Sequence, residues 1–280
     1  MTLREPQHIN ANKDSLAGNQ GLGRYIFLTG SDSRAQQISE RFNQTHVLKH
    51  PRQHNLYLGT IPGDEEPIDV AAISTGMGGS SADIIINELI MLGAQRFLRV
   101  GTAGSLQPER IVVGDVVIAT GAVRDDKASW DYIYKEYPAL ASMEYLIAIR
   151  RAIAANSPTL KSHFGIVHSK SSLYAREFHL SLMPENDQYM AVMQKAGVLA
   201  SEMECAQLFT LSSIMSTNPE RISEKSRDIL CACILTIVGD RTSFSLEQER
   251  INAAISATIS LSIETTQQLV QIDKNIKPAF

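Results

Sequence analysis

Short apolar segments that end in glycine alternate with helix-like segments along this chain, and this alternation constrains the fold more than any other feature. RYIFLTG (24–30) has the composition of a buried strand ended by glycine, and SRAQQISERF (33–42) has the pattern of the helix that follows it. IDVAAISTG (68–76) is a second such strand, and serines after its glycine-rich turn begin an apolar-striped helix that reaches Gly93. Strands that alternate with helices of this length indicate an α/β fold.

The remaining segments continue this pattern without a domain boundary. RFLRVGTAGS (96–105) and GDVVIATGAV (114–123) are predicted strands broken at small residues. Further helices are predicted near 140–155, 187–196, 204–216 and 246–270. Because there is no internal repeat and no long linker, residues 1–280 are predicted to form one domain, a central mixed sheet flanked by helices. We expect 1–23 to be an extended N-terminal segment and 271–280 to be a tail.

Composition and charge argue against several classes of protein. A formal net charge of -4 and a pI near 6.0 are unlike a general polyanion binder, because nucleic-acid-binding domains usually carry a basic surplus. No apolar run approaches the ~20 residues that span a bilayer, and the N-terminus has no signal-peptide core. Cys205, Cys231 and Cys233 lie in apolar surroundings and form no zinc pattern, which favours buried thiols. We expect a cytoplasmic protein with no membrane or nucleic-acid partner.

Two arginines, one just after a predicted strand and one within another, could bind an anion. Gly30 and Arg34 stand in TGSDSR, where glycine admits a ligand close to the backbone and the next helix offers free N–H groups. The alternative is a solvent-facing arginine at a strand–helix corner. In LRVGTAGS, Arg99 interrupts an apolar strand, so its burial requires either a bound anion or a structural salt bridge. Thr102 adds a hydroxyl three residues later.

Two glutamates in SEMECAQLF are the next candidates. Glu202 and Glu204 flank Met203 at the start of a predicted helix, where acidic residues commonly interact with the helix dipole. The functional alternative is a carboxylate that accepts hydrogen bonds from a vicinal diol while Met203 packs on an apolar sugar face. His8 and Arg52 lie in loop-like segments and would, by themselves, be surface residues. The seven histidines form no ligand cluster, so no metal site is predicted.

The apolar run CACILTIV leads into Gly239, Asp240 and Arg241. An acid at the end of a buried strand is either a turn residue held by the adjacent arginine or a general acid that protonates a leaving group. Ligands in α/β folds gather at the carboxyl ends of strands, where the other candidates also lie. These residues alone leave both interpretations of Asp240 open.

Three segments together resemble the nucleoside phosphorylase family of purine phosphorylases, uridine phosphorylases and related nucleosidases. LRVGTAGSLQPERIVVGDVVIATGAVRDDKAS is most similar to the uridine branch, and STGMGG and SEMECAQLF are close to family motifs. The resemblance runs from about His8 to the final helix and implies a nucleoside phosphorylase-like fold. The phosphate ligands that it implies are Gly30, Arg34, Arg52, Arg99 and Thr102. The ribose ligands that it implies are His8, Met203 and Glu204, with Glu202 as a further candidate.

The base pocket departs from the family pattern. Uridine phosphorylases carry F-Y-x-G-Q-x-R there, whereas this chain has SSLYAREFHL, in which no glutamine occurs. Leu173 and Tyr174 stand at the F-Y positions and Arg176 is closer to them than the family arginine; these three are the predicted base-binding residues. Asp240 matches the acid with which purine phosphorylases protonate N7, and Arg241 matches an arginine of the uridine branch. Both are predicted catalytic residues.

The sequence therefore predicts a nucleoside phosphorylase, with uridine favoured over purine nucleosides. The reaction is reversible phosphorolysis of the N-glycosidic bond, which gives free base and ribose or 2′-deoxyribose 1-phosphate. Phosphate would stabilise an oxocarbenium-like sugar, so inorganic phosphate is the co-substrate and no metal or organic cofactor is required. Because His8 and Arg52 would serve a neighbouring site, dimers and a hexamer with shared active sites are expected. The alternatives are a purine nucleoside phosphorylase with Asp240 as general acid, a hydrolytic nucleosidase, and a non-catalytic nucleoside-binding protein.

Overall fold

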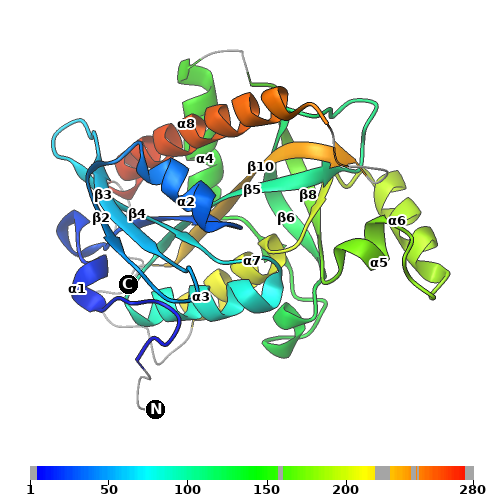
Figure 1. Cartoon of the computed structure of the whole chain (residues 1–280), viewed down its shortest axis with the longest axis horizontal. Helices are drawn as coiled ribbons and strands as arrows, with labels where there is room; N and C mark the ends of the chain where they lie inside the picture. The colour runs from blue at the N-terminus through cyan, green and yellow to red at the C-terminus, as the bar shows by residue number, and fades with distance from the viewer. Residues whose placement is uncertain (1–4, 157–159, 218–227, 241–243, 245, 275–280) are drawn as a thin grey trace.

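The computed structural model describes residues 5–156, 160–217, 228–240, 244 and 246–274. These residues form a central mixed sheet with helices on both faces (Figure 1), so the predicted α/β class is confirmed. In the part of the chain described, no helix is both long enough and apolar enough to cross a membrane.

The sheet and helices have the following bounds. The strands are β1 (Tyr25–Thr29), β2 (Asn43–Leu48), β3 (Leu56–Ile61), β4 (Ile68–Ser74), β5 (Arg96–Ser105), β6 (Val116–Asp125), β7 (Ala139–Leu140), β8 (Ser162–Lys170), β9 (Ala200–Glu202) and β10 (Leu230–Asp240). The helices are α1 (Lys13–Leu16), α2 (Asp32–Ser39), α3 (Gly79–Met91), α4 (Met143–Asn156), α5 (Leu173–Glu177), α6 (Glu185–Lys195), α7 (Cys205–Ser216) and α8 (Gln248–Asp273), with 3-10 turns η1 (Asn19–Gly21) and η2 (Ala128–Asp131).

Part of the sheet closes on itself. The strand order is β10-β6-β8-β9-β5-β1-β4-β3-β2, β7 pairs with β6, and β10 also pairs with β5. Strands β5, β10, β6, β8 and β9 therefore form a closed ring, and β1 to β4 continue from β5 as an open extension. Within the ring, Gly104 pairs with Ser201 and Ser201 pairs with His168, which brings the ends of β5, β8 and β9 together.

Strand side chains alternate between two apolar cores, one on each face of the sheet. In β10, Cys231 and Cys233 belong to the core built with α3 and α7, whereas Ala232 and Ile234 belong to the core built with α4 and α8. A strand buried on both faces produces this alternation, because successive side chains point to opposite sides. Cys205 lies in the first core, and all three cysteines are buried free thiols, as predicted.

Both ends of the described chain are more ordered than the sequence predicts. The segment expected to be extended up to residue 23 contains α1 and η1, and it places Ile9 and Leu16 in the first core. At the other end, α8 continues through the beginning of the predicted tail to Asp273. Apolar burial near the N-terminus and an ion pair near the C-terminus fix these segments.

That ion pair is buried and anchors the end of α8. Nη2 of Arg96 lies 2.7 Å from Oδ1 of Asp273, and the hydroxyl of Tyr25 donates to Oδ2 at 2.8 Å. Removing the carboxylate would leave the guanidinium buried without its counter-ion, so we expect Asp273→Ala to lower the free energy of unfolding by about 3–5 kcal/mol. Urea unfolding followed by circular dichroism measures this change.

The matched control is Glu65→Ala, which removes the partner of Lys274 in an exposed ion pair. Exposed pairs are screened by solvent, so this variant should unfold at nearly the urea concentration of the wild type. If Asp273→Ala behaved like this control, the ion pair would not anchor α8.

Candidate active site

A cavity of about 290 Å³ lies where β1, β5, β8, β9 and β10 end. Nine of the residues singled out in the sequence line it, namely Gly30, Arg34, Arg99, Thr102, Leu173, Glu202, Met203, Glu204 and Asp240. They come from segments more than 200 residues apart in the chain. Because ligands bind at strand ends in α/β folds, this cavity is the candidate active site.

Arg99 is buried on β5 and pairs with a glutamate of the cavity. Its Nη2 donates to Oε2 of Glu204 at 2.5 Å, and its Nη1 donates to Oγ1 of Thr75 at 3.2 Å. Burial acts to lower the pKa of Arg99, but the charge of Glu204, together with smaller contributions from Cys233, Glu202 and Cys205, outweighs burial and raises the pKa. A guanidinium has five N–H donors and these two bonds use two of them, so Arg99 retains donors for a ligand.

Arg34 faces the same cavity from the first turn of α2. Burial lowers the pKa of Arg34, and the positive charge of Arg99 lowers it further. Arg34 makes no hydrogen bond or ion pair with any residue whose position is described. Two guanidinium groups that repel each other in a partly buried cavity are stabilised by a bound anion, and the arginine fork suits the oxygens of a phosphate.

Glu202 supports the turn that carries Glu204. Its Oε2 accepts hydrogen bonds from the backbone N–H of Glu204 at 2.6 Å and of Cys205 at 2.8 Å, and its Oε1 accepts one from the hydroxyl of Ser169. Burial, and then the charge of Glu204, raise the pKa of Glu202. The sequence suggests a ribose ligand here, but these three bonds use most of the acceptor capacity of the carboxylate. Glu202 is therefore a positioning residue that holds the turn carrying Glu204.

Glu204 keeps more acceptor capacity. Its Oε1 accepts a hydrogen bond from the backbone N–H of Gly78 at 2.6 Å, and its Oε2 accepts the one from Arg99. A carboxylate has about four lone-pair sites, so about two remain for a ligand. Met203 also lines the cavity, and its Cε lies 3.8 Å from where a Cβ of Gly78 would stand.

Asp240 ends β10 and lines the same cavity. Its Cα partner on β5 is Ser105, and its backbone oxygen lies 3.8 Å from where a Cβ of Gly104 would stand. The acid is thus in the cavity that also holds Arg99 and Glu204. Arg241, the other predicted catalytic residue, lies outside the described residues.

An aromatic surface and a buried ion pair complete the cavity wall, and sequence reasoning missed both. The ring centroids of Phe178 and Phe244 are 5.8 Å apart, and both residues line the cavity with Leu173. Nζ of Lys170 lies 2.6 Å from Oε1 of Glu177, and each side chain is 3% exposed. The signal for Glu177 is its spacing, because it stands three residues after Tyr174, where F-Y-x-G-Q-x-R has its glutamine.

Four of the predicted residues, Arg176 among them, lie away from this lining. Nδ1 of His8 lies 2.8 Å from Oε1 of Glu88, and Arg52 is exposed in the turn between β2 and β3. Tyr174 is 60% exposed and contacts Phe178 rather than the cavity. For His8 and Arg52 a role in a neighbouring subunit's site stays a prediction.

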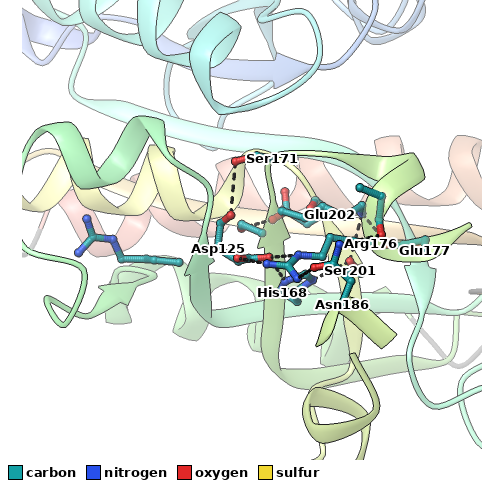
Figure 2. A network of polar contacts seen from close by, with 12 residues as sticks. Asp125, His168, Ser171, Arg176, Glu177, Asn186, Ser201 and Glu202 are labelled. Atoms are coloured by element: carbon teal, nitrogen blue, oxygen red, sulfur yellow. Dashed lines mark hydrogen bonds and ion pairs between the residues drawn. The ribbon is translucent and has the colours of Figure 1, made fainter. Parts of the chain in front are cut away.

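Arg176 belongs to a polar network beside the cavity (Figure 2). Its Nε and Nη2 donate to the two carboxylate oxygens of Asp125 at 2.7 and 2.8 Å, and its Nη1 donates to Asn186. Burial acts to raise the pKa of Asp125, but hydrogen bonds from His168 and Arg176 outweigh it and lower the pKa. The geometry does not support Arg176 as a base ligand, because its guanidinium is already bound by Asp125.

Residues 24–263, which carry the sheet and the cavity, match the family model described as the phosphorylase superfamily, and the chain belongs to that family. The resemblance noted in the sequence is thereby confirmed. The uridine phosphorylase of Treponema pallidum (strain Nichols) is 32% identical over 256 residues, which cover 90% of this chain and 92% of that protein. The guanosine phosphorylase of Halorubrum lacusprofundi is 31% identical over 185 residues, which cover 66% of this chain and 70% of that protein.

A solved structure shares the whole architecture. The crystal structure of uridine phosphorylase from Vibrio fischeri ES114, complexed with 6-hydroxy-1-naphthoic acid, matches with a TM-score of 0.75 and 27% identity. The match covers 98% of each chain. The closed ring of strands that holds the cavity is therefore part of an architecture that this chain shares with a uridine phosphorylase.

Proposed function

We propose that this protein is a nucleoside phosphorylase of the uridine type, with inorganic phosphate as co-substrate and no metal or organic cofactor. The observation that carries the proposal is the pair of arginines, Arg34 and Arg99, in one cavity with Glu204. An oxyanion site next to a carboxylate that can accept hydrogen bonds from a diol suits phosphate and ribose together. The relatives named as uridine phosphorylases support the choice of base.

In the proposed reaction, a phosphate oxygen bonds to C1′ as the N-glycosidic bond breaks and its electron pair moves to the base. Arg34, Arg99 and Thr102 hold the phosphate, and Glu204 accepts hydrogen bonds from the ribose 2′- and 3′-hydroxyls while Met203 packs on the sugar. Positive charge develops on the sugar in the transition state, where the phosphate and the Glu204 carboxylate stabilise it. Uracil leaves as an anion and takes its proton from solvent.

The resemblance also supports shared sites, in which His8 and Arg52 reach the cavity of a neighbouring subunit. Both lie away from the cavity of their own chain. We therefore propose a dimer as the functional unit, with dimers assembling into a hexamer, in the cytoplasm. Sedimentation velocity measures the assembly, and a monomer with full activity would contradict it.

The test of the function is base release from uridine, thymidine, inosine and adenosine, each with and without phosphate. Release of uracil that requires phosphate and yields ribose 1-phosphate supports the proposal. Base release at a rate independent of phosphate identifies a hydrolytic nucleosidase. Nucleoside binding without release identifies a binding protein.

The position of Asp240 in the cavity favours a second candidate, a purine nucleoside phosphorylase with Asp240 as general acid. We expect Asp240→Asn to change kcat for uridine less than about tenfold, and to lower any purine cleavage about 10²–10⁴-fold, because only a purine leaving group needs the proton. Steady-state rates on uridine and inosine measure both effects. Asp131→Asn, at an exposed position, is the control. A collapse of uridine turnover in Asp240→Asn would show that the acid also serves pyrimidines.

A further inference from the structure

We propose that Glu177, held by Lys170, accepts a hydrogen bond from a ring N–H on the edge of the base. The site would then favour bases with a protonated ring nitrogen beside a carbonyl, such as uracil, thymine, hypoxanthine and guanine. It would disfavour cytosine and adenine, whose corresponding ring nitrogen is an acceptor. This inference rests on the proposed function, because it assigns the base-recognition group of the same cavity.

The position of the carboxylate is the first support. Glu177 is the last residue of α5 and Lys170 the last residue of β8, and both line the cavity. Oε2 of Glu177 lies 3.3 Å from where a Cβ of Gly104 would stand, so the carboxylate reaches over the end of β5. Phe178, the next residue, lines the same cavity and offers a ring against which a flat base can pack.

The second support is unused acceptor capacity. Nζ of Lys170 contacts Oε1 of Glu177 at 2.6 Å, whereas Oε2 keeps accessible surface and accepts no hydrogen bond from any described residue. Buried polar atoms in folded proteins nearly always have hydrogen-bond partners, and an ionised carboxylate has about four acceptor sites. A donor from a ligand in the cavity would fill this capacity.

The network in Figure 2 explains why the carboxylate stays an acceptor. Nζ of Lys170 also donates to Oγ of Ser201 at 3.1 Å. Oγ of Ser201 lies 3.0 Å from Nδ1 of His168. Nε2 of His168 lies 3.0 Å from Oδ2 of Asp125, which Arg176 holds. These contacts fix the ammonium group beside Glu177, and a carboxylate paired with an ammonium group accepts hydrogen bonds rather than donating to a ring nitrogen. Arg176, Asp125 and His168 are positioning residues for this contact.

The test compares nucleosides that differ only at the ring nitrogen. We expect the wild type to prefer uridine to 3-methyluridine by about 10²-fold or more in kcat/KM, because methylation removes the donor and crowds Glu177. In Glu177→Ala this ratio should fall to within about threefold, since neither the acceptor nor the crowding remains. Glu177→Gln offers an amide donor as well, so the cytidine-to-uridine ratio should rise about tenfold above that of the wild type. The control is Glu136→Gln in an exposed ion pair with Lys135, which should leave both ratios unchanged.

A wild-type ratio retained in a folded Glu177→Ala would overturn the proposal, because a purely structural Glu177 lowers activity without changing the selectivity. If Glu177→Ala does not fold, the proposal is tested by the cytidine-to-uridine ratio of Glu177→Gln. A ratio equal to that of the wild type would contradict the proposal. Calorimetric binding of uracil and 3-methyluracil in the presence of phosphate separates this inference from the proposed function. If no nucleoside is cleaved, the phosphorylase proposal fails, while preferential binding of uracil that disappears in Glu177→Ala still supports the contact.

Discussion

Arg99→Met is expected to lose phosphate-dependent turnover, with kcat/KM for phosphate about 10³-fold below that of the wild type. Arg99 is the buried guanidinium of the cavity, and its Nε has no hydrogen-bond partner in the described chain. Because this charge is buried, it stabilises a phosphate dianion more strongly than it would at the surface. Methionine retains much of the apolar volume, so the loss reports the charge.

Arg34→Met is the companion variant, because Arg34 does not contact Glu204. It should raise KM for phosphate by about 10–100-fold and leave KM for uridine nearly unchanged. Initial rates against phosphate concentration at saturating uridine measure both variants, and calorimetry measures phosphate binding directly. Arg151→Met, at an exposed position on α4, is the control for the loss of one positive charge. Normal phosphate kinetics in Arg99→Met would remove Arg99 from the phosphate site.

The strands that could be predicted from the sequence are those in which consecutive residues are apolar and buried. Strands β1, β5 and β10 are apolar runs, because they carry side chains into both cores. Strand β2 (NQTHVL) has polar and largely exposed side chains, so only its pairing with β3 makes it a strand. The pairing of β10 with β5 joins segments far apart in the chain, and no local pattern encodes it. The α/β class could therefore be predicted, and the closed ring could not.

The candidate site divides in the same way. Arg99 and Glu204 could be found because a charged residue in an apolar segment needs a reason to be buried. Arg176 and Glu177 are neighbours on the five-residue helix α5, and the sequence does not say which of them faces the cavity. The structure turns Glu177 toward the cavity and Arg176 toward Asp125. That choice depends on how α5 packs against the end of β8, which is tertiary information.

Glu204→Ala is expected to lower kcat/KM for uridine by about 10²–10³-fold, because the ribose would lose two hydrogen bonds to a charged acceptor. The difference between uridine and 2′-deoxyuridine should shrink in the variant, since the contact with the 2′-hydroxyl is gone. Steady-state rates on both nucleosides measure these effects. Glu109→Ala, at an exposed position, is the control and should leave both rates unchanged.

The ion pair with Arg99 gives this variant a signature that general damage to the fold does not have. Oε2 of Glu204 neutralises Arg99 at 2.5 Å, so removing the glutamate leaves a buried guanidinium that needs another anion. Phosphate should therefore bind Glu204→Ala at least as tightly as it binds the wild type, while uridine turnover falls. A misfolded cavity would weaken phosphate binding and uridine turnover together. Weaker phosphate binding in Glu204→Ala would mean that Glu204 orients Arg99 for the phosphate, and unchanged uridine kinetics would remove Glu204 from the ribose site.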